Sequence, residues 1–457
     1  MQHAIVIGSG MAGLLAARVL SNRAEMVTVI ERDEPNFAPN PRRSLPQGNH
    51  AHLLLKRGEL ALERLFPGLM SSLEEHGSLS LDVGKELDWF HHGDWKCKVD
   101  GGLTAHLQSR PLLEWLIRRR VEVISNVFIR YRTSVSSLIW SGSSVKGVRL
   151  CAAGTHQERE ELEADLVIDA TGRGSSVPKW LQEEGFGAPQ EERNGIQLQY
   201  ASQTFARPPG DRTAAVIYQN KTTDTRAGIV FPIEGNRWQV TLIGYCGDHP
   251  SSKPEAFREF ARSLAQPHIA NVIENATPTS QIHVHALPYT YWRHYEQMKC
   301  FPKGLLCIGD SICGFDPVFG QGMTVAAIEA ELLAETLDER APLHTFFERA
   351  AKAIFLPWSL STSEGQRYPA VTGHRPPGLS LVQAYNLALF RACQSSPLVY
   401  SRFLRVLHML DGPETLFHPE VVFRVLWSAF TRKPAALPER QHEPEFVPLA
   451  RAAGHRR

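Results

Sequence analysis

The chain has 457 residues, of which 43% are hydrophobic and 21% charged, enough for two or three domains with packed cores. A net charge of +1 gives no field that would attract nucleic acid or an anionic membrane, and the longest apolar runs are far too short to span a bilayer. Seven scattered cysteines without a CxxC pair favour buried thiols over a disulfide scaffold or a zinc site. The N-terminus enters a strand at once, without a secretion signal, so we expect a cytoplasmic location.

The N-terminus is typical of a strand, a glycine-rich turn, a helix and a second strand. Two short apolar runs flank a segment with helical spacing, and the second run ends on Glu31. The turn is Gly8-x-Gly10-x-x-Gly13, whose glycines permit close approach of a pyrophosphate to the helix N-terminus. Glu31 would accept hydrogen bonds from a ribose diol. The unit predicts a dinucleotide site; the alternative is a glycine-rich turn without a ligand.

The next part of the chain predicts two helices and a second buried strand. One helix is expected over His50–Phe66, because Pro67 ends the helical spacing. The other covers 110–121, with Arg118–Arg120 as its solvated end. After several short strand-like segments, Ile168–Ser175 gives a strand end followed by another glycine-rich turn. Such a turn is expected where a cofactor passes the edge of a sheet.

Residues 195–285 alternate as half-buried antiparallel strands do, and Glu234–Gly235–Asn236 is a turn signal between two of them. Apolar residues of this sheet would either line a substrate slot or fill the core beneath it. The residues in question are Tyr200, Phe205, Val216, Tyr218, Val230, Phe231, Val240 and Leu242. We predict substrate contacts for Tyr200, Tyr218, Phe231 and, further along the chain, Phe315.

A third glycine-rich segment follows the apolar strand 304–309. Asp310, at the carboxyl end of that strand, would bind a polyol hydroxyl. A helix begins after Gly320–Gln321–Gly322, and its free N–H groups would hold a negatively charged ring edge. A reduced flavin carries such an edge and a nicotinamide does not, so the segment favours FAD over NAD. From Met323 the chain is mostly helical, and Lys433–Arg457 is expected to be loosely held.

Several histidines and one arginine permit more than one interpretation. His50 and His52 would orient a flavin or move a proton, or simply cap a helix or make a loop contact. His283 and His285 alternate on a strand without acidic or cysteine neighbours, so no metal site is expected. Arg173 would contact substrate or reductant, or form a surface ion pair.

These segments, in this order, resemble FAD-dependent monooxygenases of the para-hydroxybenzoate hydroxylase type over nearly the whole chain. The resemblance rests on the N-terminal GxGxxG, on Gly309–Asp310 and on Pro317 before Gly320–Gly322. The stretches RRSLPQGNHAHLLLKRG and SRPLLEWL look like those that place arginines near FAD, here Arg43 and Arg110. LPQGNHAHLLL, DATGRGS and FDPVFGQGMTVAA are similar to bacterial flavin epoxidases of polyether and polyketide biosynthesis.

The resemblance implies an α/β fold with three parts: a Rossmann-like FAD-binding domain of the GR2 type, an inserted antiparallel β-sheet substrate domain and a C-terminal helical region. The expected boundaries place the FAD-binding domain at 1–80, 110–194 and 299–345, the substrate domain at 81–109 and 195–298, and the helical region at 346–457.

It also implies a site. Non-covalent FAD would be held by Gly8, Gly10, Met11, Ala12, Gly13, Glu31, Arg32, Arg43, Arg110, Asp169, Gly172, Gly309, Asp310, Pro317, Gly320, Gly322 and Met323. The catalytic surroundings of the flavin would be Pro317, Gly320, Gln321, Arg43 and Gln47. Reduced flavin would add O2 at C4a, and the hydroperoxide would pass one oxygen atom to an apolar natural-product intermediate. NADPH or NADH would supply electrons directly or through a flavin reductase, because residues 169–173 replace an Asp-Gly pair of the standard hydroxylases.

The reaction type stays open at this level. Alkene epoxidation needs little beyond an apolar slot and is favoured, whereas aromatic hydroxylation needs a base or a hydrogen-bond chain. Flavin halogenases share the fold but carry a Trp-x-Trp-x-Ile-Pro element to which none of the nine tryptophans belongs. An alkene reductase and a non-catalytic FAD-binding protein are the remaining alternatives.

Overall fold

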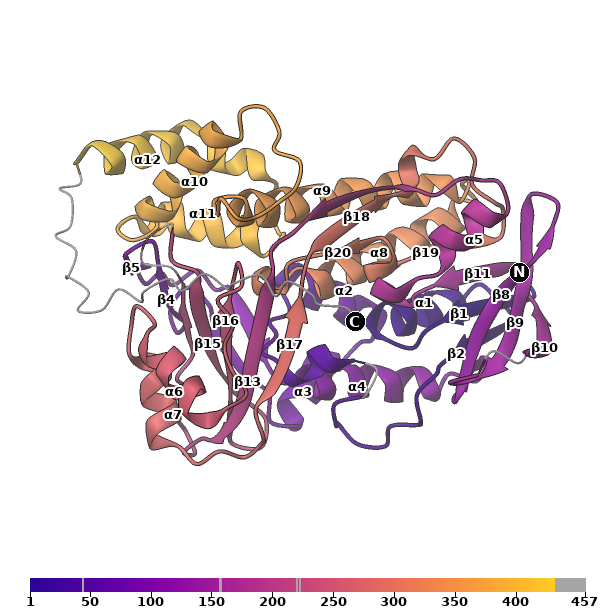
Figure 1. The fold of residues 1–457 in the computed structure, drawn as a ribbon, viewed down its shortest axis with the longest axis horizontal. Helices are drawn as coiled ribbons and strands as arrows, with labels where there is room; N and C mark the ends of the chain where they lie inside the picture. The colour runs from indigo at the N-terminus through magenta and orange to yellow at the C-terminus, as the bar shows by residue number, and fades with distance from the viewer. Residues whose placement is uncertain (43–44, 156–157, 219–220, 222, 432–457) are drawn as a thin grey trace, which may run out of the picture.

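The computed structural model describes residues 1–42, 45–155, 158–218, 221 and 223–431. Two large sheets lie side by side along the long axis of the molecule, and the C-terminal helices lie over one of them (Figure 1). The predicted fold class is confirmed: a parallel α/β unit, a second sheet and a C-terminal helical region are all present.

The first sheet is parallel and gathers strands from separated parts of the chain. Its order is β19-β11-β1-β2-β7, and every neighbouring pair is parallel. Both faces of a parallel sheet are buried, so its strands are short continuous apolar runs. The strands are β1 (His3–Ile7), β2 (Met26–Ile30), β7 (Val127–Arg130), β11 (Leu166–Asp169) and β19 (Leu305–Cys307).

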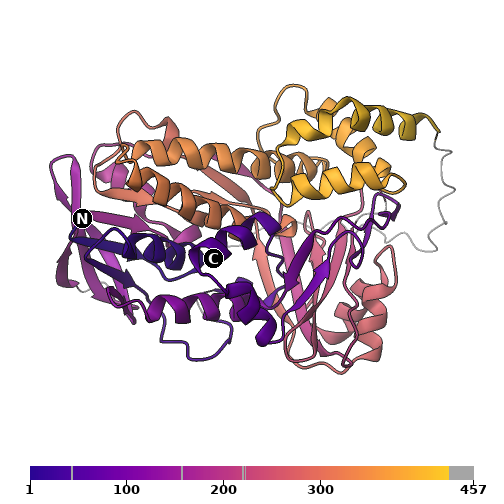
Figure 2. The ribbon, with the colours of Figure 1, turned by 180° about the vertical axis from the view of Figure 1, so that it is seen from behind.

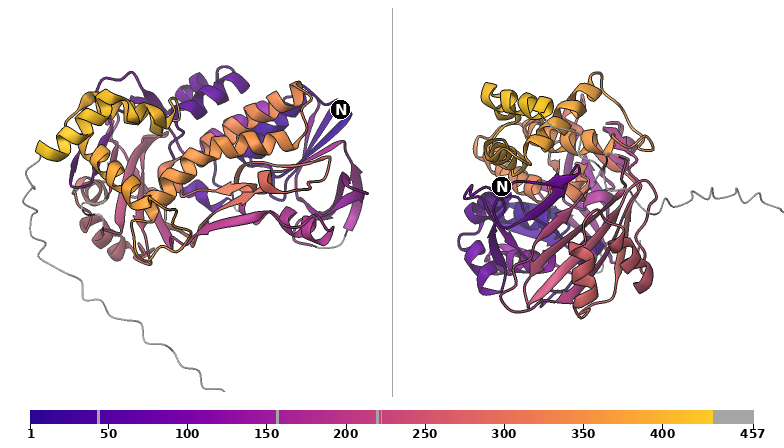
Figure 3. Two further views of the ribbon diagram at one scale, coloured as in Figure 1. Left: turned by 90° about the horizontal axis from the view of Figure 1, so that it is seen from above. Right: turned by 90° about the vertical axis from the view of Figure 1, so that its left-hand side faces the viewer.

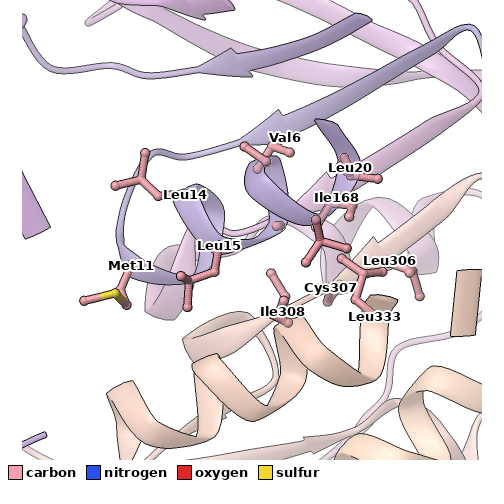
Figure 4. Close-up of a cluster of buried hydrophobic side chains, with 14 of the residues drawn as sticks. Val6, Met11, Leu14, Leu15, Leu20, Ile168, Leu306, Cys307, Ile308 and Leu333 are labelled. Carbon is pink, nitrogen blue, oxygen red and sulfur yellow. The ribbon is translucent and has the colours of Figure 1, made fainter. Parts of the chain in front are cut away.

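The core of this unit lies between the sheet and two helices from opposite ends of the sequence, α1 (Met11–Ser21) and α8 (Gly322–Asp338). Figure 4 shows side chains of α1, β1, β11, β19 and α8 meeting there, among them Leu15, Ile168 and Leu333. The helix α4 (Arg110–Glu122) also packs on α1. Remote segments thus complete one site, because α8 brings its N-terminus to the same sheet edge as α1.

The second sheet has seven strands in the order β17-β13-β16-β15-β14-β4-β5. It is antiparallel except where β14 pairs in parallel with β4. The predicted turn joins β15 to β16, and Gly235 and Asn236 adopt φ values of +69° and +51° there. The strands are β4 (Asp88–His91), β5 (Asp94–Trp95), β13 (Leu198–Ala206), β14 (Ala215–Ile217), β15 (Arg226–Ile233), β16 (Arg237–Gly244) and β17 (His283–Leu287).

The two faces of the seven-stranded sheet have different neighbours. Helices α6 (Pro254–Arg262) and α7 (His268–Asn275) cover one face. Four of the apolar residues in question, Phe205, Val230, Val240 and Leu242, are core residues on that side. Tyr200, Val216, Tyr218 and Phe231 belong to the cluster on the opposite side, which includes residues of the C-terminal helices. The alternation therefore separates core from candidate substrate residues.

Smaller elements connect these units. A three-stranded sheet of β12 (Gln190–Asn194), β18 (Thr290–His294) and β20 (Cys313–Gly314) carries the chain between the two large sheets. The others are β3 (Leu79–Asp82), β6 (Thr104–Leu107), β8 (Thr133–Ser141), β9 (Ser144–Ala152), β10 (Glu158–Glu163), α2 (Lys56–Leu65), α3 (Leu69–Glu75) and α5 (Val177–Glu183).

The C-terminal part is helical, as predicted from Met323 onward. Helices α8 and α9 (His344–Gly365) run side by side (Figure 2), and α9 reaches the helices above the seven-stranded sheet (Figure 3). Those helices are α10 (Leu379–Ala392), α11 (Pro397–Leu407) and α12 (Pro419–Thr431). None of the helices in the described residues is long and apolar enough to cross a membrane. The segment Lys433–Arg457 lies outside the described residues.

The helix predicted from His50 begins only at Lys56, so that prediction was wrong for six residues. The backbone before α2 instead bonds to the second sheet, since the N–H of Ala51 donates to Thr241 Oγ1 on β16 at 2.9 Å. This contact with the second sheet competes with helical hydrogen bonding, and sequence spacing does not show it.

Candidate active site

A cavity of about 580 Å³ lies outside the carboxyl ends of β1, β2, β11 and β19. This edge of an open α/β sheet is where ligands bind. The cavity brings together most of the predicted site residues, from widely separated parts of the chain. They are Gly8, Gly10, Met11, Ala12, Glu31, Arg32, Gln47, Arg110, Gly172, Gly309, Asp310, Phe315, Pro317, Gly320, Gln321, Gly322 and Met323.

The glycines of the first turn have separate tasks. Gly8 has a φ of +98°, and a Cβ on it would lie 2.7 Å from the Ala170 carbonyl oxygen. Gly13 does not line the cavity; a Cβ on it would lie 1.9 Å from the Gly8 carbonyl oxygen. Only glycine lets α1 pack this closely on the strand end. Gly10 is the N-cap residue of α1 and has no side chain, so the first N–H groups of α1 have no side-chain cap within the described part of the chain.

Glu31 is held by the protein at the end of β2. Its carboxylate accepts the backbone N–H groups of Ser9 and Asp33 at 3.1 and 2.9 Å, as well as the Ser9 hydroxyl. Arg42 approaches it to 3.0 Å. Burial alone would raise the pKa of Glu31, but Arg42 and the hydrogen bonds lower it overall. The carboxylate is therefore ionised and fixed at the cavity wall.

Arg118 is a site residue that the sequence analysis missed. The predicted solvated helix end is correct for Arg119, whose side chain is 56% exposed, but wrong for Arg118, which is 2% exposed. Arg118 donates to the Ser9 hydroxyl at 2.8 Å and to the Ser9 carbonyl oxygen at 2.6 Å. Through these two bonds to Ser9, Arg118 fixes the first glycine-rich turn. The packing of α4 on α1 buries it, and a run of three arginines gives no sign of which one faces inward.

Two more arginines line the cavity, and Arg42 lies beside Gly10 at the N-terminus of α1. Arg42 contacts Glu114 at 2.5 Å, and Arg110 donates to Gln47 Oε1 at 3.2 Å. The Nε atoms of both arginines are buried without a hydrogen-bond partner among the residues described. Burial lowers the pKa of Arg110, against the effect of nearby Glu114. The site thus has unused donors and positive charge beside a helix N-terminus. Arg43, predicted here, lies outside the described residues.

The opposite end of the cavity is built by the loop before α8. The short 3-10 turn Pro317–Phe319 ends at Gly320, which has a φ of +67°, and α8 begins at Gly322. Asp316 caps the turn: it accepts the Val318 N–H at 3.0 Å and the Tyr245 hydroxyl at 3.0 Å. Burial raises the pKa of Asp316 to about 6. These bonds fix the backbone that carries the uncapped N-terminus of α8.

Asp310 and Asp169 occupy different positions. Asp310 lines the cavity, in the turn after β19. Asp169, predicted to bind the cofactor, is not brought to the cavity wall: its carboxylate accepts the Thr171 hydroxyl at 2.6 Å and the Ser175 hydroxyl at 2.5 Å. It organises the glycine-rich turn that does line the cavity, which contains Gly172.

Arg173 lines the cavity from the same turn. It donates to the Tyr289 carbonyl oxygen at 2.9 Å, and its guanidinium lies 4.8 Å from the centre of the Tyr291 ring. The side chain is thus held by the chain around β18 and not in a surface ion pair. Its Nε is buried and has no hydrogen-bond partner in the described structure.

A second cavity, of about 110 Å³, lies between the seven-stranded sheet and the C-terminal helices. Pro317 and Gly320 line both cavities, so the second adjoins the α8 end of the first. Its walls are mainly apolar and include the predicted Tyr218 and Phe231, with Leu53, Leu55, Val83, Leu87, Trp89, Val216, Ile229, Val318, Phe319, Leu360, Phe390, Phe403 and Leu407. Tyr200 lines a small pocket of about 20 Å³ that also contains Pro317.

The two histidines before α2 line the small pocket, where His50 is buried and His52 is half-buried. His50 Nδ1 lies 2.7 Å from the Ser202 hydroxyl, and His52 Nε2 lies 2.7 Å from the Gln47 carbonyl oxygen. Burial lowers the pKa of both to about 3, so both are neutral at pH 7. Neither side chain caps α2 in the described structure, and of the two only His52 lines the large cavity. Between them they tie the extended chain to the second sheet and to Gln47.

Comparison with known proteins identifies the class. Residues 1–341 match the model of the FAD binding domain family, so the chain belongs to that family. With its two-sheet fold, it is a member of the FAD-dependent monooxygenases of the para-hydroxybenzoate hydroxylase type.

Two curated proteins and one solved structure are similar to this chain over most of its length. The chain is 33% identical to Protein Rv3254 of Mycobacterium tuberculosis (strain ATCC 25618 / H37Rv) over 433 residues, 90% of each chain. It is 24% identical to kynurenine 3-monooxygenase of Salinispora arenicola (strain CNS-205), over 77% of this chain and 76% of that protein. The fold matches PqsL, a probable FAD-dependent monooxygenase from Pseudomonas aeruginosa, with a TM-score of 0.61, 19% identity and coverage of 80% and 99%.

The residues present fit FAD. Unpartnered guanidinium nitrogens of Arg42 and Arg110 beside the N-terminus of α1 match a pyrophosphate, which is anionic and accepts hydrogen bonds. At the other end of the cavity, the uncapped N-terminus of α8 matches a negatively charged flavin edge.

Proposed function

We propose that this protein is an FAD-dependent monooxygenase that transfers one oxygen atom from O2 to an apolar small molecule, with alkene epoxidation as the reaction. The observation that carries the proposal is the apolar cavity that adjoins the flavin end of the FAD site at Pro317 and Gly320. Bound reduced FAD would supply the O2 chemistry. The chain's own task is to hold an apolar substrate beside it in a site that excludes water.

The first set of roles concerns binding of the cofactor. The N–H groups of Gly10 to Ala12, with Arg42 and Arg110, would hold the pyrophosphate. Glu31 would face the adenosine ribose and Asp310 the ribityl chain, because each lies at the carboxyl end of a strand on the cavity wall.

The second set concerns the reacting end. Gln321, Gly322 and Met323 would place backbone N–H groups against the flavin edge that becomes negative on reduction, while Pro317 and Gly320 separate the flavin from the substrate. Gln321 Oε1 is buried without a partner in the described residues and would accept a hydrogen bond from the bound ring. Gln47, bonded to Arg110, lines both the FAD cavity and the small pocket that contains Tyr200.

The polar groups of the apolar cavity favour epoxidation over phenol hydroxylation. Tyr218 donates to the Val318 carbonyl oxygen at 3.0 Å, and burial raises its pKa. Glu364 forms an ion pair with Arg367, with 2.7 Å between Oε2 and Nε. A phenol would need a free acceptor for its proton, and these two groups already have partners. An alkene makes no such demand.

Electron supply and location complete the proposal. NADPH or NADH would reduce the FAD, directly or through a flavin reductase, and the protein would act in the cytoplasm. Adding each nicotinamide to the FAD-loaded protein without oxygen, with and without a flavin reductase, distinguishes the routes by the bleaching of the flavin absorbance.

Oxygen transfer is tested with ¹⁸O2. The FAD-loaded protein, reduced by dithionite and then mixed with ¹⁸O2 and a panel of aryl alkenes, should yield an epoxide that carries one ¹⁸O atom by mass spectrometry. Label in a phenol panel instead would establish aromatic hydroxylation. The proposal would be overturned if the alkene were reduced to the alkane, or if the flavin reoxidised completely with no labelled product from either panel.

Aromatic hydroxylation is the second candidate because of one relative. The kynurenine 3-monooxygenase of Salinispora arenicola has a name that gives an aromatic amine as its substrate. Asp316 would serve that reaction through Tyr245, which lines the apolar cavity and donates to the Asp316 carboxylate at 3.0 Å, because burial raises the pKa of Asp316 to about 6.

A further inference from the structure

Two residues that line the apolar cavity each carry a buried ring nitrogen without a hydrogen-bond partner among the described residues. These nitrogens are Nε1 of Trp89, on β4, and Nε2 of His408, just after α11. Both atoms are buried, and both residues line the cavity. A buried donor without an acceptor costs free energy, so such groups in a binding cavity indicate where a ligand supplies the acceptor.

The proton of His408 is located by its second ring nitrogen. Nδ1 accepts the backbone N–H of Lys56 at 3.1 Å, and the His408 carbonyl oxygen accepts the N–H of Arg57 at 3.2 Å. His408 thus caps the N-terminus of α2 and is itself wholly buried. Because Nδ1 accepts a hydrogen bond, it carries no proton, and Nε2 of the neutral ring is a donor. Burial lowers the pKa of His408 to about 4, which keeps the ring neutral at pH 7.

Trp89 provides the second donor from the opposite wall. Its ring packs 5.9 Å from the Phe403 ring and 6.3 Å from the Tyr218 ring, so the indole is fixed by aromatic contacts. The indole N–H can only donate. One donor therefore comes from the sheet and one from the C-terminal helices, on the two surfaces that enclose the cavity.

Three other polar residues of the cavity wall already bond to protein groups, unlike Trp89 Nε1 and His408 Nε2. The Tyr218 hydroxyl is bound to Val318, the Tyr245 hydroxyl to Asp316, and Glu364 to Arg367. The unmet hydrogen bonds of Trp89 and His408 are both donations. Neutral oxygen acceptors fit apolar walls better than a carboxylate, whose burial without a cationic partner is expensive.

We propose that the substrate is an apolar molecule with a carbonyl oxygen, and that Trp89 Nε1–H and His408 Nε2–H donate to this oxygen and orient the reacting carbons. The inference rests on the proposed function in treating the cavity as the substrate site. It excludes a pure hydrocarbon as the preferred substrate and makes Trp89 and His408 specificity residues. Neither contact requires a charged substrate.

The test compares the binding of two probes of the same shape. Acetophenone has a C=O group where α-methylstyrene has C=CH2. Dissociation constants are measured on the FAD-loaded protein. Trp89→Phe should weaken acetophenone about five-fold, as expected for one hydrogen bond, and change α-methylstyrene less than about two-fold. The control, Trp140→Phe, makes the same change on β8, which contributes no residue to the wall of the apolar cavity, and should leave the ratio of the two constants unchanged.

A second readout needs no variant. In ¹⁵N-labelled protein, acetophenone should move the resonances of the Trp89 indole N–H and the His408 Nε2–H, and α-methylstyrene should not move them in the same direction. An unchanged ratio in Trp89→Phe, or equal shifts with both probes, would overturn the inference, since water would then satisfy these donors. Both measurements are made without turnover. A failure of oxygen transfer would therefore leave the binding results intact, and a failure of the binding test would leave the oxygen-transfer result intact.

Discussion

Glu329 and Gly309 are joined by a hydrogen bond of 2.6 Å, which the backbone N–H of Gly309 donates to Oε2 of a wholly buried carboxyl. The bond links α8 to the turn that presents Asp310 to the FAD cavity. Burial raises the pKa of Glu329 from 4.5 to about 8, and the nearby Asp310 adds to the effect. The carboxyl is therefore protonated at neutral pH, and a neutral side chain joins α8 to the turn that carries Asp310.

Replacement of Glu329 should flatten the pH dependence of stability. The folded state holds this proton more tightly than the unfolded state, so the stabilisation is full below pH 4.5 and is lost as the pH rises to about 8. One proton gives a slope of at most about 1.4 kcal/mol per pH unit. Glu329→Gln keeps a neutral acceptor for Gly309 and should remove this part of the slope in urea unfolding of the FAD-loaded protein. The exposed Glu348→Gln should keep it; an unchanged slope in Glu329→Gln would contradict the assignment.

Arg118 should matter for FAD binding where its neighbour does not. Arg118→Met removes two hydrogen bonds to Ser9 from a buried cation, each worth about 1.5–3 kcal/mol in such settings. We expect FAD affinity to fall by at least about ten-fold, as 1.4 kcal/mol corresponds to a factor of ten. Arg119→Met, on the exposed side of the same helix, should bind FAD as the wild type does. Fluorescence titration of the apoprotein with FAD measures both, and equal affinities would rule out the role of Arg118.

Much of the fold and site was predictable from the sequence because it depends on local patterns. Gly8, Gly10 and Glu31 sit at strand ends that apolar runs define, and Gly320 to Gly322 mark the start of α8. The alternation on the seven-stranded sheet correctly places Tyr218 and Phe231 on one face. Each of these features follows from backbone geometry within a few residues.

The residues that were missed depend on long-range packing. Arg42 and Arg118 reach the first turn only because α4 and the loop after β2 fold over it. Asp169 has the position of a ligand in the sequence, but its own turn uses its carboxylate. His408 lies 352 positions from Lys56, and no local pattern links them. Such contacts require the three-dimensional arrangement.

Gly13 should be intolerant of a methyl group although it does not line the cavity. A Cβ at this position would lie 1.9 Å from the Gly8 carbonyl oxygen, so Gly13→Ala must push α1 away from β1. Overpacking of this kind costs about 1–3 kcal/mol, and here it also moves the N–H groups that face FAD. We expect a lower urea midpoint and weaker FAD binding. Gly101→Ala, whose Cβ would have its nearest neighbour at 3.9 Å, is the control; equal behaviour of the two variants would show that the helix has room.

Filling the apolar cavity should separate oxygen transfer from cofactor binding. Val216 lines the cavity on β14, and Val216→Phe would occupy space beside Pro317 without reaching the residues that line only the FAD cavity. FAD affinity should stay within about two-fold, while ¹⁸O transfer to alkenes should fall at least about ten-fold, because a displaced substrate loses its near-attack position. Oxygen would then be reduced to hydrogen peroxide, which a peroxidase assay detects. Val123→Phe, at a residue that is 77% exposed, controls for added bulk. If Val216→Phe left epoxide yields unchanged, the substrate would have to bind elsewhere, most simply in the FAD cavity near Arg173.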